Sequence, residues 1–259
     1  MRKLCASFQL WGPNSDPILK IPEPNQTEDD SNQVPAMTDA IEVRYGTLAE
    51  SSCCLSCGSA VTHVTAQPGQ RCLDLGCGRG TDVMRLAERV GESGHAYGID
   101  ITDSMLDKAR RTAEKLGVKN VTFLRADLAA LPLSDSEVDW VTSNCVLNHA
   151  DDKAAVWREI ARVLKPGGQF VISDIYAIEP VPEVYKNDPE AVAECWAGAI
   201  LKSEYLAAIG DAGLTNINIF EESAPYEKGK IKVASFTLSG NRPGLAPASP
   251  LRAKVKCCS

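Results

Sequence analysis

The pattern of apolar and polar residues between positions 71 and 176 alternates between short apolar runs and longer amphipathic stretches. The apolar runs predict five buried strands, at 71–76, 95–101, 121–127, 138–146 and 169–176. The amphipathic stretches predict helices at 81–91, 103–117, 152–168 and 203–214. Strands that alternate with helices form a mostly parallel sheet with helices on both faces. The expected fold class is therefore α/β, with a doubly wound sheet.

Two further apolar segments follow the last predicted helix, at 217–223 and 231–240. They are close enough in the sequence to pair as a hairpin. Together with the five earlier strands they predict a mostly parallel seven-stranded sheet that has an antiparallel edge strand. The stretch 177–202, which precedes the helix at 203–214, interrupts the alternation and is expected to form a lid insertion.

The two ends of the chain lack this periodicity. Residues 1–36 are polar and contain five prolines, so a disordered N-terminal extension is expected there. Residues 241–259 contain three prolines and four basic residues, which predicts a flexible C-terminal tail. The globular domain is therefore expected to span residues 37–240.

Charge and composition exclude several classes of partner. A net charge of −7 argues against nucleic acid, because phosphate binding needs a basic face. No apolar run approaches the ~20 residues of a membrane span, and the basic start of the chain lacks a cleavage site. The expected location is the cytoplasm. In that reducing compartment the ten cysteines indicate ligands or reactive thiols rather than disulfides.

A glycine-rich loop after the first predicted strand indicates a cofactor site. Its spacing, Gly76-x-Gly78-x-Gly80, differs from the G-x-G-x-x-G of dinucleotide enzymes, and it permits close approach of a ligand to the backbone. Asp100 ends the second strand about 20 residues later, where a carboxylate can accept hydrogen bonds from ribose. Asp74, Asp100 and Asp127 could each be ordinary strand-end polarity. The three acids and the glycine loop together predict S-adenosylmethionine as the cofactor. The residues expected to bind it are Asp74, Gly76, Gly78, Asp100, Ile101, Asp127, Leu128 and Asn144.

Three side chains near the ends of the later strands are candidates for chemistry. His149 could act as a base for an O- or N-methylation, although a single histidine is more often structural. Cys145 ends the fourth predicted strand, where open sheets of this kind bind their ligands. Cys195 lies beside Trp196 in the insertion, which would cover the cofactor. Either cysteine could instead be a small buried residue.

Several motifs resemble known families. The glycine loop, Asp100, "ADLAALPL" (126–133) and "RVLKPGG" (162–168) resemble the Rossmann-like Class I methyltransferases over about residues 70–176. The motifs "RYG" (44–46), "SNCVLN" (143–148) and "ECWAGA" (194–199) resemble the arsenite methyltransferases over roughly residues 39–240. A pair of adjacent cysteines and a later Cys-Gly also belong to this resemblance.

The resemblance to arsenite methyltransferases implies a specific site and activity. By position, Cys145 and Cys195 match two arsenic-binding cysteines of the family, and Cys57 matches a third. Cys53 and Cys54 match an upstream pair that, in the family, can form a disulfide or help capture substrate. Only two residues separate this pair from Cys57, fewer than in the family, which leaves the third ligand open among these cysteines. The implied function is methylation of arsenite in arsenic detoxification, with a thiol reductant such as glutathione or thioredoxin as partner.

Physical chemistry agrees with this implication, and two alternatives remain open. Thiolates are the soft ligands that trivalent arsenic prefers, and its lone pair needs no base before it accepts a methyl group. Cys54-x-x-Cys57 is also half of a zinc site, so a methyltransferase of small organic substrates with a structural zinc is one alternative. A thiol-rich metalloid-binding protein without turnover is the other. Cys72 and Cys77 are expected to be structural, and Cys257–Cys258 could hand arsenic to the site.

Overall fold

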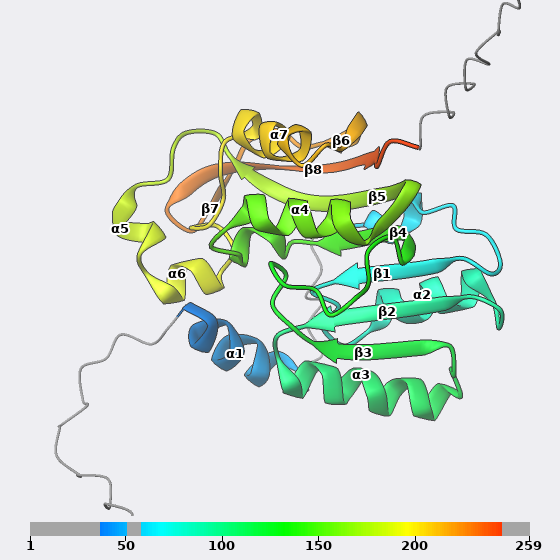
Figure 1. Ribbon diagram of the computed structural model, residues 1–259. Coiled ribbons are helices and arrows are strands. Elements are labelled where there is room, and N and C mark those ends of the chain that lie inside the picture. Colours follow the sequence, from blue (N-terminus) through cyan, green and yellow to red (C-terminus); the bar gives the residue numbers. More distant parts are fainter. Residues whose placement is uncertain (1–36, 51–57, 245–259) are drawn as a thin grey trace, which may run out of the picture. The chain divides into compact units, whose positions relative to one another are not determined.

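The computed structural model describes residues 37–50 and 58–244, all of which belong to one compact unit (Figure 1). The expected disordered extension, most of the expected tail and the cysteines at positions 53, 54, 57, 257 and 258 lie outside the described residues. Within the described part of the chain, no helix is long and apolar enough to cross a membrane.

An eight-stranded sheet forms the centre of the fold, in the order β3-β2-β1-β4-β5-β8-β6, with the short β7 paired to β8. Strands β1 to β5 are parallel, and β8 runs antiparallel to β5, β6 and β7. The predicted doubly wound sheet with an antiparallel edge is thus confirmed, and the extra strand is the short β7. The strands are β1 (Arg71–Leu75), β2 (His95–Asp100), β3 (Val121–Arg125), β4 (Val138–Asn144), β5 (Leu164–Ala177), β6 (Thr215–Glu222), β7 (Tyr226–Lys228) and β8 (Ile231–Asn241).

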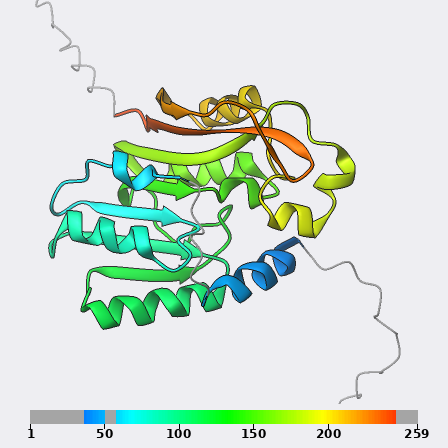
Figure 2. The same ribbon diagram turned by 180° about the vertical axis from the view of Figure 1, so that it is seen from behind.

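Helices cover both faces of the sheet, as Figures 1 and 2 show from opposite sides. The apolar faces of α4 and α7 pack on one face, and those of α2 and α3 pack on the other. The helices are α1 (Met37–Leu48), α2 (Thr81–Val90), α3 (Asp103–Leu116), α4 (Lys153–Val163), α5 (Glu183–Lys186), α6 (Pro189–Ala193) and α7 (Lys202–Asp211). Two short 3₁₀ helices, η1 (Ala60–His63) and η2 (Leu147–His149), complete the fold.

Two predicted boundaries are wrong, for local reasons. The helix predicted within 152–168, with Pro-Gly-Gly as its end, already ends at Val163, and β5 begins at Leu164, whose backbone is extended. Pro166 disfavours helical conformation at Lys165, so the helix ends before the proline rather than at it. The strand predicted over 138–146 ends at Asn144, because Cys145 adopts a left-handed conformation with φ of 55° and turns the chain out of the sheet.

The predicted insertion at 177–202 contains α5 and α6 and has a small core of its own. Val181, Val192 and Trp196 pack together against Ile175 of β5 and Val233 of β8. Helix α1 contacts both α6 and α3, near the carboxyl ends of the parallel strands (Figure 1). These elements leave a cavity between α1 and the sheet.

Candidate functional site

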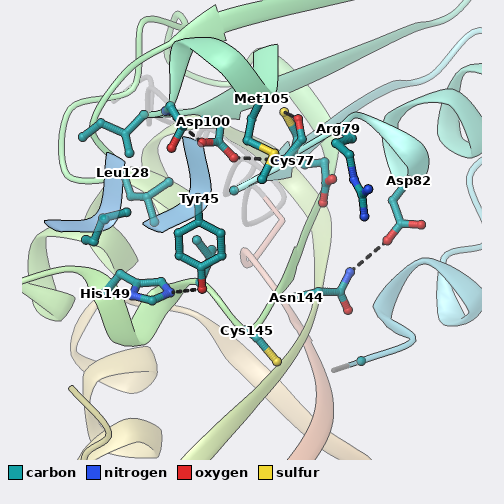
Figure 3. Close-up of a pocket in the computed structure, with 18 of the residues that line it drawn as sticks. Tyr45, Cys77, Arg79, Asp82, Asp100, Met105, Leu128, Asn144, Cys145 and His149 are labelled. Carbon is teal, nitrogen blue, oxygen red and sulfur yellow. Dashed lines mark hydrogen bonds between the residues drawn. The ribbon is translucent and has the colours of Figure 1, made fainter. Parts of the chain in front are cut away.

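A cavity of about 440 Å³ lies at the carboxyl ends of the parallel strands, which is where open α/β sheets bind their ligands (Figure 3). Its walls come from the glycine loop, the ends of β2 and β4, the segment after β3, and α1. All eight residues predicted to bind the cofactor line this cavity: Asp74, Gly76, Gly78, Asp100, Ile101, Asp127, Leu128 and Asn144. The structure therefore brings the predicted set together in one place.

The glycine loop has a conformation that side chains would disturb. Gly76, Gly78 and Gly80 all have positive φ, at 63°, 49° and 76°. A Cβ on Gly76 would lie 2.3 Å from a methyl carbon of Val146, so the loop and the end of β4 are in close contact. The loop can approach both a ligand and its neighbouring strand because it lacks these atoms.

Asp100 is held by the backbone at the end of β2. One carboxylate oxygen accepts a hydrogen bond from Gly78 N at 2.8 Å, and the other accepts from Thr102 N at 2.9 Å. Burial raises the pKa of Asp100, while these hydrogen bonds act in the opposite direction. Each oxygen keeps a second lone pair, so the carboxylate can accept further bonds from a ligand in the cavity.

Asp74 and Asp82 add two more acids to the same cavity. Burial, and next the charge of Asp82, raise the pKa of Asp74 well above its usual value. Asp74 accepts a hydrogen bond from Thr142 Oγ1 at 2.8 Å, and Asp82 accepts one from Asn144 Nδ2 at 3.0 Å. Carboxylates that oppose each other's ionisation favour a ligand that carries positive charge.

Asp82 was missed in the sequence prediction. Its position in the sequence could have indicated it, because Asp82 follows Gly80 by two residues and lies in the first turn of α2, beside the loop. Its importance depends on the contact with Asn144, which lies 62 positions later and which no local pattern indicates (Figure 3).

Asp127 lies at the edge of the cavity. One of its carboxylate oxygens accepts a hydrogen bond from Ala129 N at 2.8 Å.

Cys145 and Cys195 lie next to each other although 50 residues separate them in sequence. Cys145 follows β4 and lines the cavity, while Cys195 is buried just after the end of α6. The Cys195 thiol donates to the carbonyl oxygen of Cys145 at 3.2 Å. Both residues have positive φ, 55° and 77°, which is uncommon outside glycine and is enriched at active sites.

His149 is buried and uses both ring nitrogens. Nδ1 lies 3.0 Å from the carbonyl oxygen of Val192, and Nε2 lies 3.1 Å from the hydroxyl of Tyr45 (Figure 3). Burial lowers the pKa of His149 to about 4, so the ring is neutral near pH 7. This environment favours the structural interpretation of His149 over that of a base.

The remaining described cysteines lie in the core. Burial raises the pKa of Cys72 to about 12 and that of Cys77 well above its usual value. Both pack among the apolar residues of α2 and α3, which agrees with the structural role predicted for them. Among the described residues, no group of three or more His, Cys, Asp or Glu side chains could hold a metal ion.

Comparisons with known proteins agree with the predicted resemblances. A family model described as a methyltransferase domain matches residues 66–213. An arsenite methyltransferase of Halobacterium salinarum is 38% identical over 165 residues, which is 64% of this chain and 42% of the relative. An arsenite methyltransferase of Mus musculus is 42% identical over 139 residues, 50% of this chain and 37% of the relative. The chain thus spans less than half the length of these relatives.

A solved structure gives the same result over more of the chain. An arsenic(III) S-adenosylmethionine methyltransferase from Chlamydomonas reinhardtii superposes with a TM-score of 0.62 and is 28% identical. The match covers 82% of this chain and 75% of that chain. The resemblance predicted from the motifs is confirmed: the chain belongs to the methyltransferase domain family and is similar, within it, to the arsenite methyltransferases.

Proposed function

We propose that this protein methylates arsenite with S-adenosylmethionine, and that Cys145 and Cys195 bind the arsenic. The single observation that carries the proposal is that the Cys195 thiol donates a hydrogen bond to the backbone of Cys145, which lines the cofactor cavity, and that both residues have positive φ. Trivalent arsenic binds soft thiolate ligands, and the contact between the Cys195 thiol and the backbone of Cys145 brings two cysteines from different elements to one place. Methylation of arsenite would serve arsenic detoxification.

The cavity chemistry supports S-adenosylmethionine as the cofactor. Bound there, S-adenosylmethionine would supply a methyl group on a positively charged sulfur: the arsenic lone pair would form the new As–C bond, while the S–C bond breaks and its electrons stay on the neutral thioether that leaves. Asp100 would accept hydrogen bonds from the ribose hydroxyls, and Asp127 would bind the adenine amino group. Asp74 and Asn144 would face the amino-acid end, near the glycine loop. The charges of Asp82 and Asp100, which raise the pKa of Asp74, fit a ligand with an ammonium and a sulfonium group.

Apolar and glycine residues would shape the rest of the cofactor site. Ile101 and Leu128 line the cavity beside Asp100 and Asp127 and would contact the adenine ring. Gly76 and Gly78 would let the loop backbone approach the cofactor, because neither carries a Cβ.

The third sulfur for arsenic would come from the segment that holds Cys53, Cys54 and Cys57, with Cys57 as the predicted ligand and the other two as capture residues. This segment lies outside the described residues. The described chain resumes at Gly58, which lines the cavity and packs against Ser173 so tightly that a Cβ would lie 2.2 Å from the Ser173 Cβ. Its position supports a thiol donor from the preceding residues.

The charges around the thiols support thiolate chemistry without a base. Arsenic has a lone pair and carries no proton to remove, so the protein needs only to orient it. Lys153 of α4 is largely buried, which lowers its pKa, and its charge interacts favourably with a Cys195 thiolate. A cytoplasmic thiol such as glutathione or thioredoxin would keep the cysteines reduced between turnovers.

One experiment tests the proposal against its alternatives. The protein is incubated with arsenite, S-adenosylmethionine and glutathione, and products are separated by chromatography and identified by mass. Methylated arsenic in amounts above the enzyme concentration is the expected result. Arsenic that binds without any methylated product would favour a metalloid-binding protein. Stoichiometric zinc in the purified protein, with no arsenic product, would favour a methyltransferase of small organic substrates.

A further inference from the structure

The side chain of His149 lies between two helices that are far apart in the sequence. Its Nδ1 is 3.0 Å from the carbonyl oxygen of Val192 in α6, and its Nε2 is 3.1 Å from the hydroxyl of Tyr45 in α1. A carbonyl oxygen can only accept a hydrogen bond. Nδ1 therefore carries the proton, and Nε2 accepts from the tyrosine hydroxyl. The two contacts fix both the tautomer and the orientation of the ring.

Each element joined by His149 contributes to the proposed site. Cys145 lies four residues before His149, on the same connection after β4. Cys195 lies three residues after Val192, and its thiol donates to the carbonyl oxygen of Cys145 at 3.2 Å. Tyr45 lines the cofactor cavity. One imidazole thus contacts both thiol-bearing segments and the helix that forms a wall of the cavity.

We propose that His149 is a positioning residue that sets the arrangement of the two thiol-bearing segments relative to the cofactor cavity. Methyl transfer requires the arsenic and the methyl group to be in line, so a small displacement of either wall would slow it. The effect on methyl transfer rests on the proposed function. The contacts by which His149 joins α1 to α6 do not depend on that function.

The surroundings of His149 keep this link intact across physiological pH. Burial is the largest cause that lowers its pKa to about 4. The positive charges of Lys153 in α4, Arg44 in α1 and Lys228 in β7 act in the same direction. The hydrogen bond to Val192 raises the pKa and is the second-largest influence after burial, but it does not offset the burial. The ring therefore remains neutral, and Nε2 continues to accept from Tyr45.

Three variants separate the two contacts. Tyr45→Phe removes the hydroxyl and keeps the ring. His149→Asn keeps a donor close to the position of Nδ1, so the bond to Val192 can survive while the bond to Tyr45 is lost. His149→Ala removes both bonds.

Matched controls come from β2. Tyr97→Phe removes a hydroxyl that donates to Glu137 at 2.9 Å, and His95→Asn removes a ring nitrogen that lies 2.8 Å from Thr122 Oγ1. Neither control residue lines the cofactor cavity.

Amide hydrogen exchange tests the link without any use of activity. We expect Tyr45→Phe and His149→Asn to speed exchange in α1 but not in α6, and His149→Ala to speed it in both helices. The β2 controls should leave both helices unchanged. Unchanged exchange in α1 for Tyr45→Phe would overturn the proposal, even if the histidine variants fold poorly, because this variant removes only one oxygen.

Methylation rates distinguish a positioning residue from a base. A hydrogen bond of ordinary strength predicts a fall of roughly 2- to 10-fold for Tyr45→Phe and for His149→Asn, and the double variant should be no slower than the slower single variant. The shape of the pH profile should not change. A loss of about 10²- to 10⁴-fold in His149→Asn, with Tyr45→Phe near wild type, is expected of a base and would overturn the proposal. If the wild-type protein makes no methylated arsenic, the proposed function fails, and hydrogen exchange alone decides this inference.

Discussion

The cofactor cavity and the thiol site are neighbours, but the chain builds them in opposite ways. At the centre of the cofactor cavity is one continuous stretch, 74–82, together with Asp100, which accepts a hydrogen bond from Gly78 N at 2.8 Å. The thiol site depends on Cys145 and Cys195, which come from separate elements and meet only through tertiary packing. The conformation of the glycine loop depends largely on local backbone geometry, whereas the thiol site depends entirely on long-range contacts. Changes in one site should therefore leave the other largely intact.

The largest expected effect separates the two sites completely. Cys145→Ser and Cys195→Ser should each abolish methylation of arsenite while the affinity for S-adenosylmethionine stays at the wild-type level. A hydroxyl is a hard and poor ligand for arsenic, although serine is nearly isosteric with cysteine. Product mass spectrometry and a cofactor titration measure the two effects. Cys72→Ser is the control, because Cys72 lies in the core and should leave methylation by the folded protein unchanged. Full activity in both thiol variants would rule out thiolate binding at this site.

A change at Asp100 should affect only the affinity for the cofactor. Asp100→Ala removes the acceptor proposed for the ribose hydroxyls, and hydrogen bonds to charged groups contribute about 1.5–3 kcal/mol. The affinity for S-adenosylmethionine should fall roughly 10- to 100-fold. Binding of arsenite in the absence of cofactor, measured by the mass of the complex, should not change. Asp211→Ala, at the end of α7 and outside the cavity, is a matched acid control. A folded Asp100→Ala protein with normal cofactor affinity would remove Asp100 from the site.

The same difference explains what the sequence could and could not predict. The fold class, the glycine loop and Asp100 follow from local patterns: apolar alternation, glycine spacing and the end of a strand. The pairing of Cys145 with Cys195 could be expected only from a family resemblance, since no local spacing brings the two together. Helix α1 was not predicted, because its sequence, MTDAIEVRYGTL, has no continuous apolar face. Its position depends on contacts with α3 and α6, which a single-sequence pattern does not encode.

A smaller effect is expected from a change in the contact behind the thiols. A Cβ on Gly198 would lie 1.9 Å from the carbonyl oxygen of Asn148, so Gly198→Ala must push the insertion away from the segment that follows Cys145. Overpacking of this kind costs about 1–3 kcal/mol in the free energy of unfolding. Methylation should fall, and cofactor affinity should be kept. Gly210→Ala in α7 is the control, since a Cβ there meets nothing within 4 Å. Equal activity in both variants would show that the Asn148 contact does not set the position of Cys195.

The smallest effect concerns acid stability and arises because two buried groups act in opposite directions. His149 has a pKa of about 4 in the fold against 6.5 when unfolded, so its contribution to stability is lost as the pH falls from about 6.5 to 4. Burial raises the pKa of Asp174 to about 7 from 3.8, so its contribution grows as the pH falls from about 7 to 4. At 1.36 kcal/mol per pKa unit, the two contributions should cancel to within about 1 kcal/mol.

Variants of His149 and Asp174 separate their opposing contributions to the free energy of unfolding. Between pH 7 and pH 4, the unfolding free energy of His149→Asn should rise relative to wild type, because the term lost on acidification is gone. That of Asp174→Asn should fall, because the compensating term is gone. Urea denaturation at several pH values measures both slopes. Parallel pH profiles for the wild-type protein and both variants would contradict the assigned pKa shifts.

The left-handed backbone of Cys145 and Cys195 has a consequence for how this protein can change over generations. Glycine, and to a lesser extent asparagine, adopts positive φ more readily than cysteine does, and strain of this kind is worth of order 1–3 kcal/mol per residue. Selection for thermal stability alone should therefore replace both cysteines. A library evolved for heat tolerance without arsenic should lose the thiols at these two positions first, while the same library grown with arsenite should retain them. Persistence of cysteine at both positions would then depend on exposure to the metalloid rather than on the needs of folding.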